Sequence, residues 1–298
     1  MNEERLVISA VVIVLDGIRF LPDCLFTLVN DLEGFNYELI VVDNGSSDGS
    51  VGFVKEQHPS ARLIENGRNL GFARAVNQGV EAAKGENLYI LNQDLRFHPG
   101  TANGLLKRLN SDESIGLIGP AFVGFDGRLQ KSVRAFPTYR HVFYRALFLD
   151  RIFSTHREFS HWRMGWFDHQ REMFVDQPMG AAMLIPRRVI DKVGLMDESF
   201  PILFNDVDYC RRISEAGYKL LYYPEVTVEH YVGATTGRWP YRMKAISHLA
   251  MYRYLRKYAR WYEYPALWLC ALLLLIGLVP SMAGRFIRTL FTSKAPSS

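Results

Sequence analysis

The stretch that decides the fold is Leu88 to Asp94, which reads Leu-Tyr-Ile-Leu-Asn-Gln-Asp. Its four consecutive apolar residues are typical of a strand buried on both faces, and the run then ends on polar side chains. A carboxylate that follows such a strand lies at the carboxyl edge of the sheet, where open α/β sheets bind ligands. Asp94 is therefore a candidate ligand for Mg²⁺ or Mn²⁺. The alternative is an ordinary polar turn, because His98-Pro99-Gly100 has turn chemistry.

The segments before this strand alternate between strand and helix patterns. The expected strands are 6–15, 38–42 and 62–65, and the expected helices are 20–32, 50–57 and 71–84. Such alternation predicts an α/β fold, with a mostly parallel sheet flanked by helices. Asp43 and Asp94 both follow strands, so both should open onto one edge of that sheet.

Length, charge and cysteine content exclude several classes of protein. The chain has 298 residues, 48% of them hydrophobic, and a formal net charge of +4. This size allows a sizeable core, and so small a charge is not that of a nucleic-acid-binding protein. Three widely separated cysteines predict neither a disulfide framework nor a zinc site, which fits a reducing compartment. The amino terminus leads straight into a strand pattern, so we expect no signal peptide.

Three segments resemble a known family. The loop Val41 to Ser50, Val-Val-Asp-Asn-Gly-Ser-Ser-Asp-Gly-Ser, resembles the nucleotide-binding loop of family 2 glycosyltransferases, which have the GT-A fold. Asn69 to Gly79 resembles the next segment of that family. Leu91-Asn92-Gln93-Asp94 stands where the family has its Asp-x-Asp metal motif. Asn92 replaces the first Asp, as in bacterial rhamnosyltransferase-like members, and this leaves one charge fewer for a metal. Arg134 to Thr138 also resembles those members.

The resemblance implies a site for transferring a sugar from a nucleotide diphosphate. Such a reaction needs a neutralised diphosphate, a fixed nucleotide and a base for the acceptor hydroxyl. It implies a divalent cofactor, Mg²⁺ or Mn²⁺. The implied residues are Asp206 as the general base, Asp43, Asn44, Asn69, Arg74 and Asn92 for the donor, Asp208 and Gly180 on the acceptor side, and Asp94 and His230 for the metal. Where the family has Glu-Asp in the segment of its acceptor site, this sequence has Asn205-Asp206.

Each of these residues also has a structural explanation. The alternative for Asp43 is capping of the next helix, and the alternative for Arg74 is a solvated helix face. Asp206 and Asp208 suit the first turn of a helix, where the dipole favours acids, and His230 suits a hydrogen-bonded strand position. Their joint order over residues 6–236 favours the family.

Two other classes of protein stay open at this point. A nucleotidyltransferase is disfavoured because Asp16-Gly17-Ile18 is no Gly-rich basic loop. A non-catalytic membrane or glycan-binding protein is left open by Asn92 and Asn205.

The rest of the chain suggests a catalytic domain over 1–237, with a nucleotide half of about 1–120 and an acceptor half of about 121–237. Helices are expected at 101–109, 187–193 and up to about Glu215, strands at 115–119, 220–223 and 226–230, and a hairpin at Asp126-Gly127. Residues 131–175 hold four of the eight histidines without metal-ligand spacing, so we interpret them as a solvated or interfacial segment.

Residues 238–298 predict membrane attachment. Arg238 to Tyr262 interleaves basic and aromatic residues, which suits the headgroup layer of an anionic membrane. A solvated helix packed on the catalytic domain is the alternative. From Tyr264 to Gly284 no residue is charged, which is about the length of a span, but both flanks are basic, so a re-entrant or in-plane helix is favoured over a span. We expect an enzyme at the cytoplasmic face of the bacterial inner membrane that uses dTDP-rhamnose or a UDP-hexose and a lipid-linked glycan acceptor.

Overall fold

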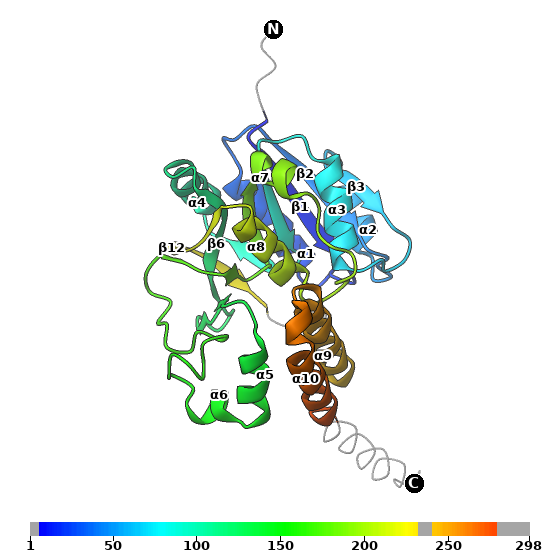
Figure 1. The fold of residues 1–298 in the computed structure, drawn as a ribbon. Helices are drawn as coiled ribbons and strands as arrows, with labels where there is room; N and C mark the ends of the chain where they lie inside the picture. Colours follow the sequence, from blue (N-terminus) through cyan, green and yellow to red (C-terminus); the bar gives the residue numbers. More distant parts are fainter. Residues whose placement is uncertain (1–5, 232–239, 279–298) are drawn as a thin grey trace, which may run out of the picture. The chain divides into compact units, whose positions relative to one another are not determined.

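The computed structural model describes residues 6–231 and 240–278 of the chain (Figure 1). The chain forms two compact units. The first comprises Met1–Phe136 and Phe167–Thr235, and the second comprises Pro137–Trp166 and Thr236–Ser298. The segment 137–166, whose role the sequence left open, thus belongs with the C-terminal helices.

The first unit alternates strands and helices as the sequence predicts. Its helices are α1 (Leu21–Asp31), α2 (Ser50–Gln57), α3 (Phe72–Ala82), α4 (Thr101–Asn110), α7 (Arg187–Val193) and α8 (Asn205–Glu215). Its strands are β1 (Ile8–Val14), β2 (Tyr37–Asp43), β3 (Arg62–Glu65), β4 (Asn87–Asn92), β5 (Leu95–Phe97), β6 (Ile115–Val123), β7 (Leu129–Gln130), β8 (Val133–Arg134), β9 (Met173–Phe174), β10 (Gln177–Pro178), β11 (Ala182–Pro186) and β12 (Lys219–His230). The expected hairpin at Asp126-Gly127 joins β6 to β7.

The main sheet is mixed: most of its strands point the same way, as predicted, but β11 and β5 run against them. Its strands follow the order β3-β2-β1-β4-β11-β6-β12-β5. The strands β1 to β4 are parallel, but β11 runs antiparallel between β4 and β6, and β5 runs antiparallel to β12. Hydrophobic patterns identify strands without specifying their neighbours, and the three-residue β5 is too short to leave a pattern. Since β11 is antiparallel to both of its neighbours, β6 and β12 point the same way as β4, and the carboxyl ends of all these strands share one edge.

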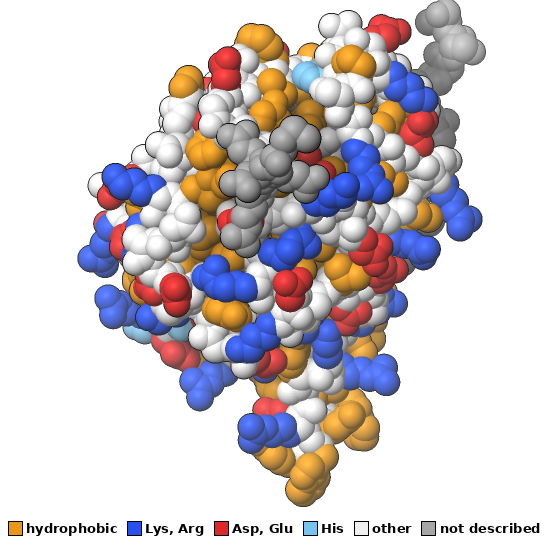
Figure 2. Space-filling view, turned by 90° about the horizontal axis from the view of Figure 1, so that it is seen from above, with side chains coloured by type: hydrophobic (Ala, Val, Ile, Leu, Met, Phe, Trp, Pro, Cys, Tyr) orange, Lys and Arg blue, Asp and Glu red, His pale blue; other side chains and the backbone are white. Residues whose placement is uncertain are grey.

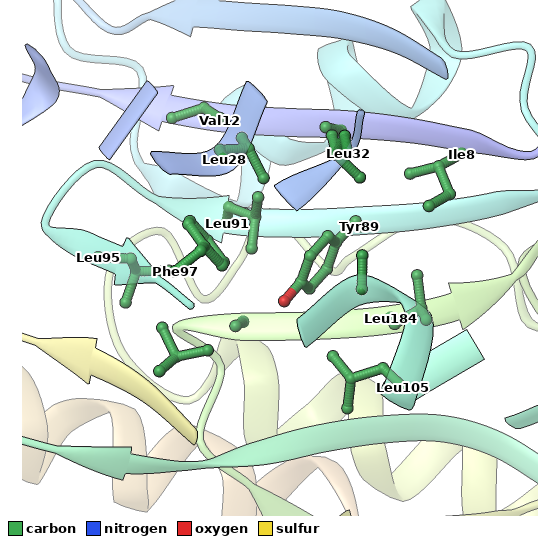
Figure 3. Close-up of a cluster of buried hydrophobic side chains, with 14 of the residues drawn as sticks. Ile8, Val12, Leu28, Leu32, Tyr89, Leu91, Leu95, Phe97, Leu105 and Leu184 are labelled. Carbon is green, nitrogen blue, oxygen red and sulfur yellow. The ribbon is translucent and has the colours of Figure 1, made fainter. Parts of the chain in front are cut away.

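Alternating side chains of the central strands divide the core into two layers. Ile8 and Val12 of β1 and Tyr89 and Leu91 of β4 face the layer that contains α1 and α4, as Figure 3 shows. The intervening residues of the same strands pack against α3, α7 and α8 on the other face. This period of two matches a sheet that is covered on both sides, which explains why β1 and β4 are apolar at nearly every position.

The second unit is helical. It contains α5 (Tyr139–Ala146), α6 (Leu149–Ile152), α9 (Pro240–Lys257), the short 3₁₀ helix η2 (Trp261–Glu263) and α10 (Tyr264–Ile276). The Cys270 thiol of α10 donates to the Tyr139 carbonyl of α5 at 3.8 Å, and Lys244 of α9 donates to the Gly277 carbonyl at 2.8 Å. Residues 279–284 of the expected apolar segment, and the basic residues on either side at Arg238 and Arg285, lie outside the described residues. No helix among the described residues is both long enough and apolar enough to cross a membrane.

Candidate active site

Asp43 ends β2 at the carboxyl edge and shapes the loop that follows it. Its carboxylate is buried and accepts the backbone N–H groups of Gly45 at 3.0 Å and Ser46 at 3.1 Å. Gly45 has a φ of +90°, and a Cβ there would lie 2.6 Å from the backbone of Arg68, so only glycine suits this turn. Asp43 therefore builds the loop, and its contact with a nucleotide stays a prediction.

The predicted donor residues Asn44 and Asn69 bind each other. The Asn44 amide donates to Asn69 Oδ1 at 3.1 Å, and its Oδ1 accepts the Leu70 N–H at 3.0 Å. The structure thus joins two loops that are far apart in the sequence. Both amides are largely used in holding those loops together, which makes them supports of the edge on which a nucleotide would lie.

Arg74 lies in the first turn of α3. Its guanidinium is 3.9 Å from the Glu198 carboxylate, and both side chains are about half exposed. At the amino end of α3, the N–H of Phe72 already donates a hydrogen bond to the Pro201 carbonyl. Arg74 is the one basic residue of α3, and its contact with a diphosphate stays a prediction.

The segment that leads to α8 is tied to α3 by a residue that the sequence analysis missed. The side-chain amide of Asn77 donates to the Met196 carbonyl at 2.9 Å and accepts the Met196 N–H at 2.9 Å. Asn77 is buried, and its partner lies 119 positions away. These two hydrogen bonds hold the segment that precedes Asp206 in the chain against α3.

Asn92 and Gln93 fix the end of β4. The N–H of Asn92 donates to the Ala181 carbonyl at 2.9 Å. Gln93 pairs with the backbone of Leu15 through bonds of 2.8 and 2.9 Å, which ties the loop after β1 to β4. A Cβ on Gly17 would lie 2.0 Å from the Gln93 amide oxygen, so a larger residue there would displace the Gln93 side chain. Gln93 stands inside the Asn-Gln-Asp motif, where the sequence analysis gave it no role.

Asp94 lies in the turn between β4 and β5 and faces His230 at the end of β12. Both side chains are buried, and His230 Nε2 is 3.8 Å from Asp94 Oδ1. Burial raises the pKa of the Asp94 carboxyl to about 7 and lowers the pKa of His230 to about 4. The fold thus brings together the two predicted metal ligands, Asp94 and His230. Burial makes the Asp94 carboxyl costly to ionise and favours the neutral form of the His230 imidazole.

Gln130 of β7 sets the orientation of His230. The Gln130 amide nitrogen donates to the His230 carbonyl at 2.7 Å, which leaves its Oε1 to accept a hydrogen bond from the N–H at His230 Nδ1 at 3.0 Å. With Nδ1 protonated, the lone pair of Nε2 points toward Asp94. A hydrogen bond of this kind orients histidine ligands in metal sites, and no local pattern reveals Gln130 because its partner is 100 positions away.

These residues fit a divalent ion. A buried carboxylate and an unprotonated imidazole nitrogen can supply two ligands, and a substrate diphosphate commonly supplies others to Mg²⁺. The described residues contain no group of three or more His, Cys, Asp and Glu side chains that could hold a metal by themselves. The pair therefore suits a metal that is held jointly with its substrate.

Asp206 lies in the first turn of α8, close to the backbone of Gly180. Its Oδ2 accepts a hydrogen bond from the Gln177 amide at 2.7 Å, and its Oδ1 accepts the Val207 N–H at 2.9 Å. A Cβ on Gly180 would lie 2.8 Å from Cβ of Asp206, so glycine permits this approach. Burial raises the pKa of the half-buried Asp206 carboxyl, and the bonds from Val207 and Gln177 oppose that shift.

Asp208 has a different environment. Its side chain is fully buried, and Arg212, four residues later in α8, donates to it at 3.0 Å. Arg212 also donates to the Leu195 carbonyl at 2.7 Å, so this ion pair holds the segment before α8. Asp208 lies in the block that the resemblance indicated, with its carboxylate occupied by a structural partner.

The fold with this carboxyl edge corresponds to a known class of enzyme. Residues 9–174, more than half of the chain, match the family model of "Glycosyl transferase family 2". The chain belongs to glycosyltransferase family 2 and is a glycosyltransferase that uses nucleotide sugars, which confirms the family predicted from the sequence.

Two curated relatives are rhamnosyltransferases, as the Asn-Gln-Asp motif suggested. The N-acetylglucosaminyl-diphospho-decaprenol L-rhamnosyltransferase of Mycobacterium tuberculosis is 26% identical over 257 residues, which cover 77% of this chain and 78% of that protein. The dTDP-rhamnosyl transferase RfbF of Shigella flexneri is 24% identical over 215 residues, which cover 69% of this chain and 64% of that protein.

Solved structures confirm the predicted GT-A fold. The mannosyltransferase PcManGT of Pyrobaculum calidifontis, solved with GDP-Man and Mn²⁺, has a TM-score of 0.58 at 16% identity, with 99% of this chain and 77% of that chain covered. GalNAc-T7, solved with UDP, GalNAc and Mn²⁺, has a TM-score of 0.56 at 17% identity, with 77% of this chain and 44% of that chain covered. At these identities the likeness establishes the fold alone.

Proposed function

We propose that this enzyme transfers L-rhamnose from dTDP-rhamnose to a lipid-linked glycan acceptor with inversion at the sugar carbon. The observation that carries the proposal is the Asp206 carboxylate, which lies beside the small residue Gly180 at the carboxyl edge of the sheet. The names of the two rhamnosyltransferase relatives support the sugar, and that of the mycobacterial protein supports a lipid diphosphate acceptor.

In this proposal Asp206 is the general base. Gln177 and the N–H of Val207 hold its carboxylate in one orientation. The raised pKa increases its basicity at neutral pH, which favours taking the proton of an acceptor hydroxyl as that hydroxyl attacks. The hydroxyl oxygen forms the new bond to the sugar carbon, and the dTDP leaves from the opposite face. A single displacement of this kind inverts the configuration.

Asp94 and His230 would hold a divalent metal, Mg²⁺ or Mn²⁺, on the donor side. When bound, the metal neutralises the charge that develops on the leaving diphosphate. Gln130 keeps the Nε2 lone pair of His230 available. Arg74 would add a second positive charge. Asp43, Asn44 and Asn69 hold the two loops that would receive the nucleotide. Asp208 positions α8 through its ion pair with Arg212.

A panel of donors tests this proposal. Thermal shift and transfer assays with Mn²⁺ would compare dTDP-rhamnose with UDP-glucose, UDP-N-acetylglucosamine and GDP-mannose, using a polyprenyl diphosphate sugar as the acceptor. We expect dTDP-rhamnose to give the largest shift and the fastest transfer. If a UDP-hexose exceeds it, the donor assignment is wrong. Absence of binding and transfer with every donor would support a non-catalytic glycan-binding role.

We also propose that the enzyme attaches to the cytoplasmic face of the bacterial inner membrane through residues 238–298. The interleaved basic and aromatic residues of α9 and the uncharged sequence of α10 support this attachment. An acceptor on a lipid carrier would then be met at the surface where the enzyme resides.

A further inference from the structure

Positive charge is concentrated in the second unit. Its described residues, 137–166 and 240–278, contain eleven Lys and Arg side chains and three Asp and Glu side chains. The described residues of the first unit contain nineteen Lys and Arg side chains and twenty-six Asp and Glu side chains. Two of the acids of the second unit pair with basic side chains of that unit, Asp150 with Arg163 at 3.6 Å and Glu158 with Arg140 at 3.4 Å. The third, Glu263, accepts the backbone N–H of Arg260 at 2.7 Å. The unit therefore suits an anionic partner.

The helix α10 exposes an apolar stripe. Trp268, Leu272 and Leu275 are 68%, 53% and 63% exposed, and their spacing of four and three residues places them on one face. Leu267 and Cys270, which lie off this stripe, are fully buried. No charged residue occurs between Tyr264 and Leu278. An exposed helix face of this composition is unfavourable in water and favourable in a lipid interface.

A second apolar surface surrounds α6, in the segment that the sequence could not explain. Leu147, Phe148, Ile152 and Phe153 are all exposed, by 64%, 57%, 67% and 46%. Phe148 has a φ of +59°, a conformation that is costly for an aromatic residue and that turns the chain between α5 and α6. The Arg151 guanidinium lies 5.6 Å from the Phe148 ring. In Figure 1, α6 and the carboxyl end of α10 lie toward the same end of this unit.

We propose that the turn around α6 is a second membrane-docking element, which inserts Phe148 and Ile152 into the headgroup boundary of an anionic bilayer alongside the exposed stripe of α10. This inference rests on the proposed membrane attachment and extends it to a segment more than 80 positions earlier in the chain. Large apolar side chains next to arginine are the composition of interfacial anchors. Figure 2 draws the face seen from above in Figure 1, where red Asp and Glu side chains accompany the blue Lys and Arg side chains.

Charge disfavours a second copy of the chain as the occupant of this surface. Two identical positive units would bring like charges together, at a cost that an anionic membrane does not impose. Exposed leucine, isoleucine and phenylalanine side chains also gain more from the hydrocarbon of a lipid bilayer than from the charged phosphates that dominate nucleic-acid binding.

The test is co-sedimentation of the full-length protein with vesicles. One set of vesicles contains phosphatidylglycerol and phosphatidylethanolamine, and the other contains only phosphatidylcholine. The double variant Phe148→Asp/Ile152→Asp should bind the anionic vesicles about 10- to 100-fold more weakly than the unmodified protein, because it loses two buried apolar side chains and adds two negative charges. Aspartate tolerates the left-handed backbone at position 148. The matched control is Phe26→Asp, a change of an equally exposed residue (65%) on α1 of the first unit.

We expect Phe26→Asp to bind the vesicles like the unmodified protein, and phosphatidylcholine vesicles to bind all proteins weakly. Donor binding by thermal shift should be the same in every variant, which excludes misfolding as the cause. Full vesicle binding by the α6 variant together with loss of binding by Trp268→Asp/Leu272→Asp would overturn this inference and leave the C-terminal attachment intact. Absence of vesicle binding by the unmodified protein would overturn both. A variant that changes only from dimer to monomer would identify the surface as a protein interface.

Discussion

Replacing Gln130 with leucine should weaken metal binding by a protein whose proposed metal ligands are unchanged. In the structure Gln130 donates to the His230 carbonyl at 2.7 Å and accepts from His230 Nδ1 at 3.0 Å. Leucine fills similar space and removes both bonds. His230 then has two tautomers and two ring orientations, of which about one in four presents a bare Nε2 to Asp94.

The size of the effect follows from this count. A fourfold loss of the competent state corresponds to about 0.8 kcal/mol. Loss of the hydrogen bond also lowers the basicity of the imidazole, and outer hydrogen bonds to metal-binding histidines are typically worth about 10- to 100-fold in affinity or activity. We therefore expect Gln130→Leu to raise the Mn²⁺ concentration needed for half-maximal donor binding by at least tenfold.

The assay is a Mn²⁺ titration at a fixed, subsaturating concentration of nucleotide sugar, followed by thermal shift or calorimetry. Leu129→Ala, at the exposed neighbouring position in β7, serves as the control and should leave the titration unchanged. Gln130→Glu keeps an oxygen opposite Nδ1 and should retain much of the Mn²⁺ affinity. The reasoning is refuted if Gln130→Leu titrates like the unmodified protein, or if excess chelator leaves donor binding and transfer undiminished.

Three further predictions concern the base, the buried carboxylate and the segment before α8. Asp206→Asn should preserve donor binding and lower turnover by about 10²- to 10⁴-fold; near-full transfer by this variant, with loss in Asp208→Asn, would move the base to Asp208. For Asp94→Asn, the measurement is the free energy of unfolding in urea, in metal-free solution. Its value for the variant minus its value for the unmodified protein should increase by about 2 to 3 kcal/mol from pH 5 to pH 8. The sign follows from the pKa of about 7, which lies above the ordinary 3.8. The folded protein retains a proton that the unfolded chain releases, so the unmodified protein loses stability as the pH rises. A difference in the free energy of unfolding that does not change with pH would contradict this reasoning. Asn77→Ala should lower the free energy of unfolding by about 2 to 3 kcal/mol because it leaves both backbone groups of Met196 unpaired. The control Glu81→Ala, on the exposed face of α3, should change the free energy of unfolding by less than about 0.5 kcal/mol. Equal effects of the two substitutions would show that the hydrogen bonds of Asn77 contribute little.

Local patterns in the amino-acid sequence were sufficient for most elements of the first unit. The boundaries of α2, β3 and α7 agree with the predicted residues, because turn and capping residues flank each segment. The position of Asp43 at the end of β2 was predictable for the same reason, and so was that of Asp94, although β4 ends two residues earlier at Asn92: a buried apolar run that stops on a carboxylate places that carboxylate at the edge of the sheet. The family followed from these loops, since their residues are contiguous.

The partners of these carboxylates were decided only by the tertiary structure. Gln130 and His230 are 100 positions apart, and Asn77 and Met196 are 119 positions apart, so no local period or spacing relates them. The antiparallel direction of β11 also depends on which strands flank it rather than on its own residues. Hydrophobic periodicity records how a segment is buried, whereas a hydrogen bond between distant side chains records which segments meet. The sequence therefore predicted that Asp94 follows a buried strand and that His230 ends one, and the fold determined that one neutral imidazole nitrogen faces one buried carboxylate.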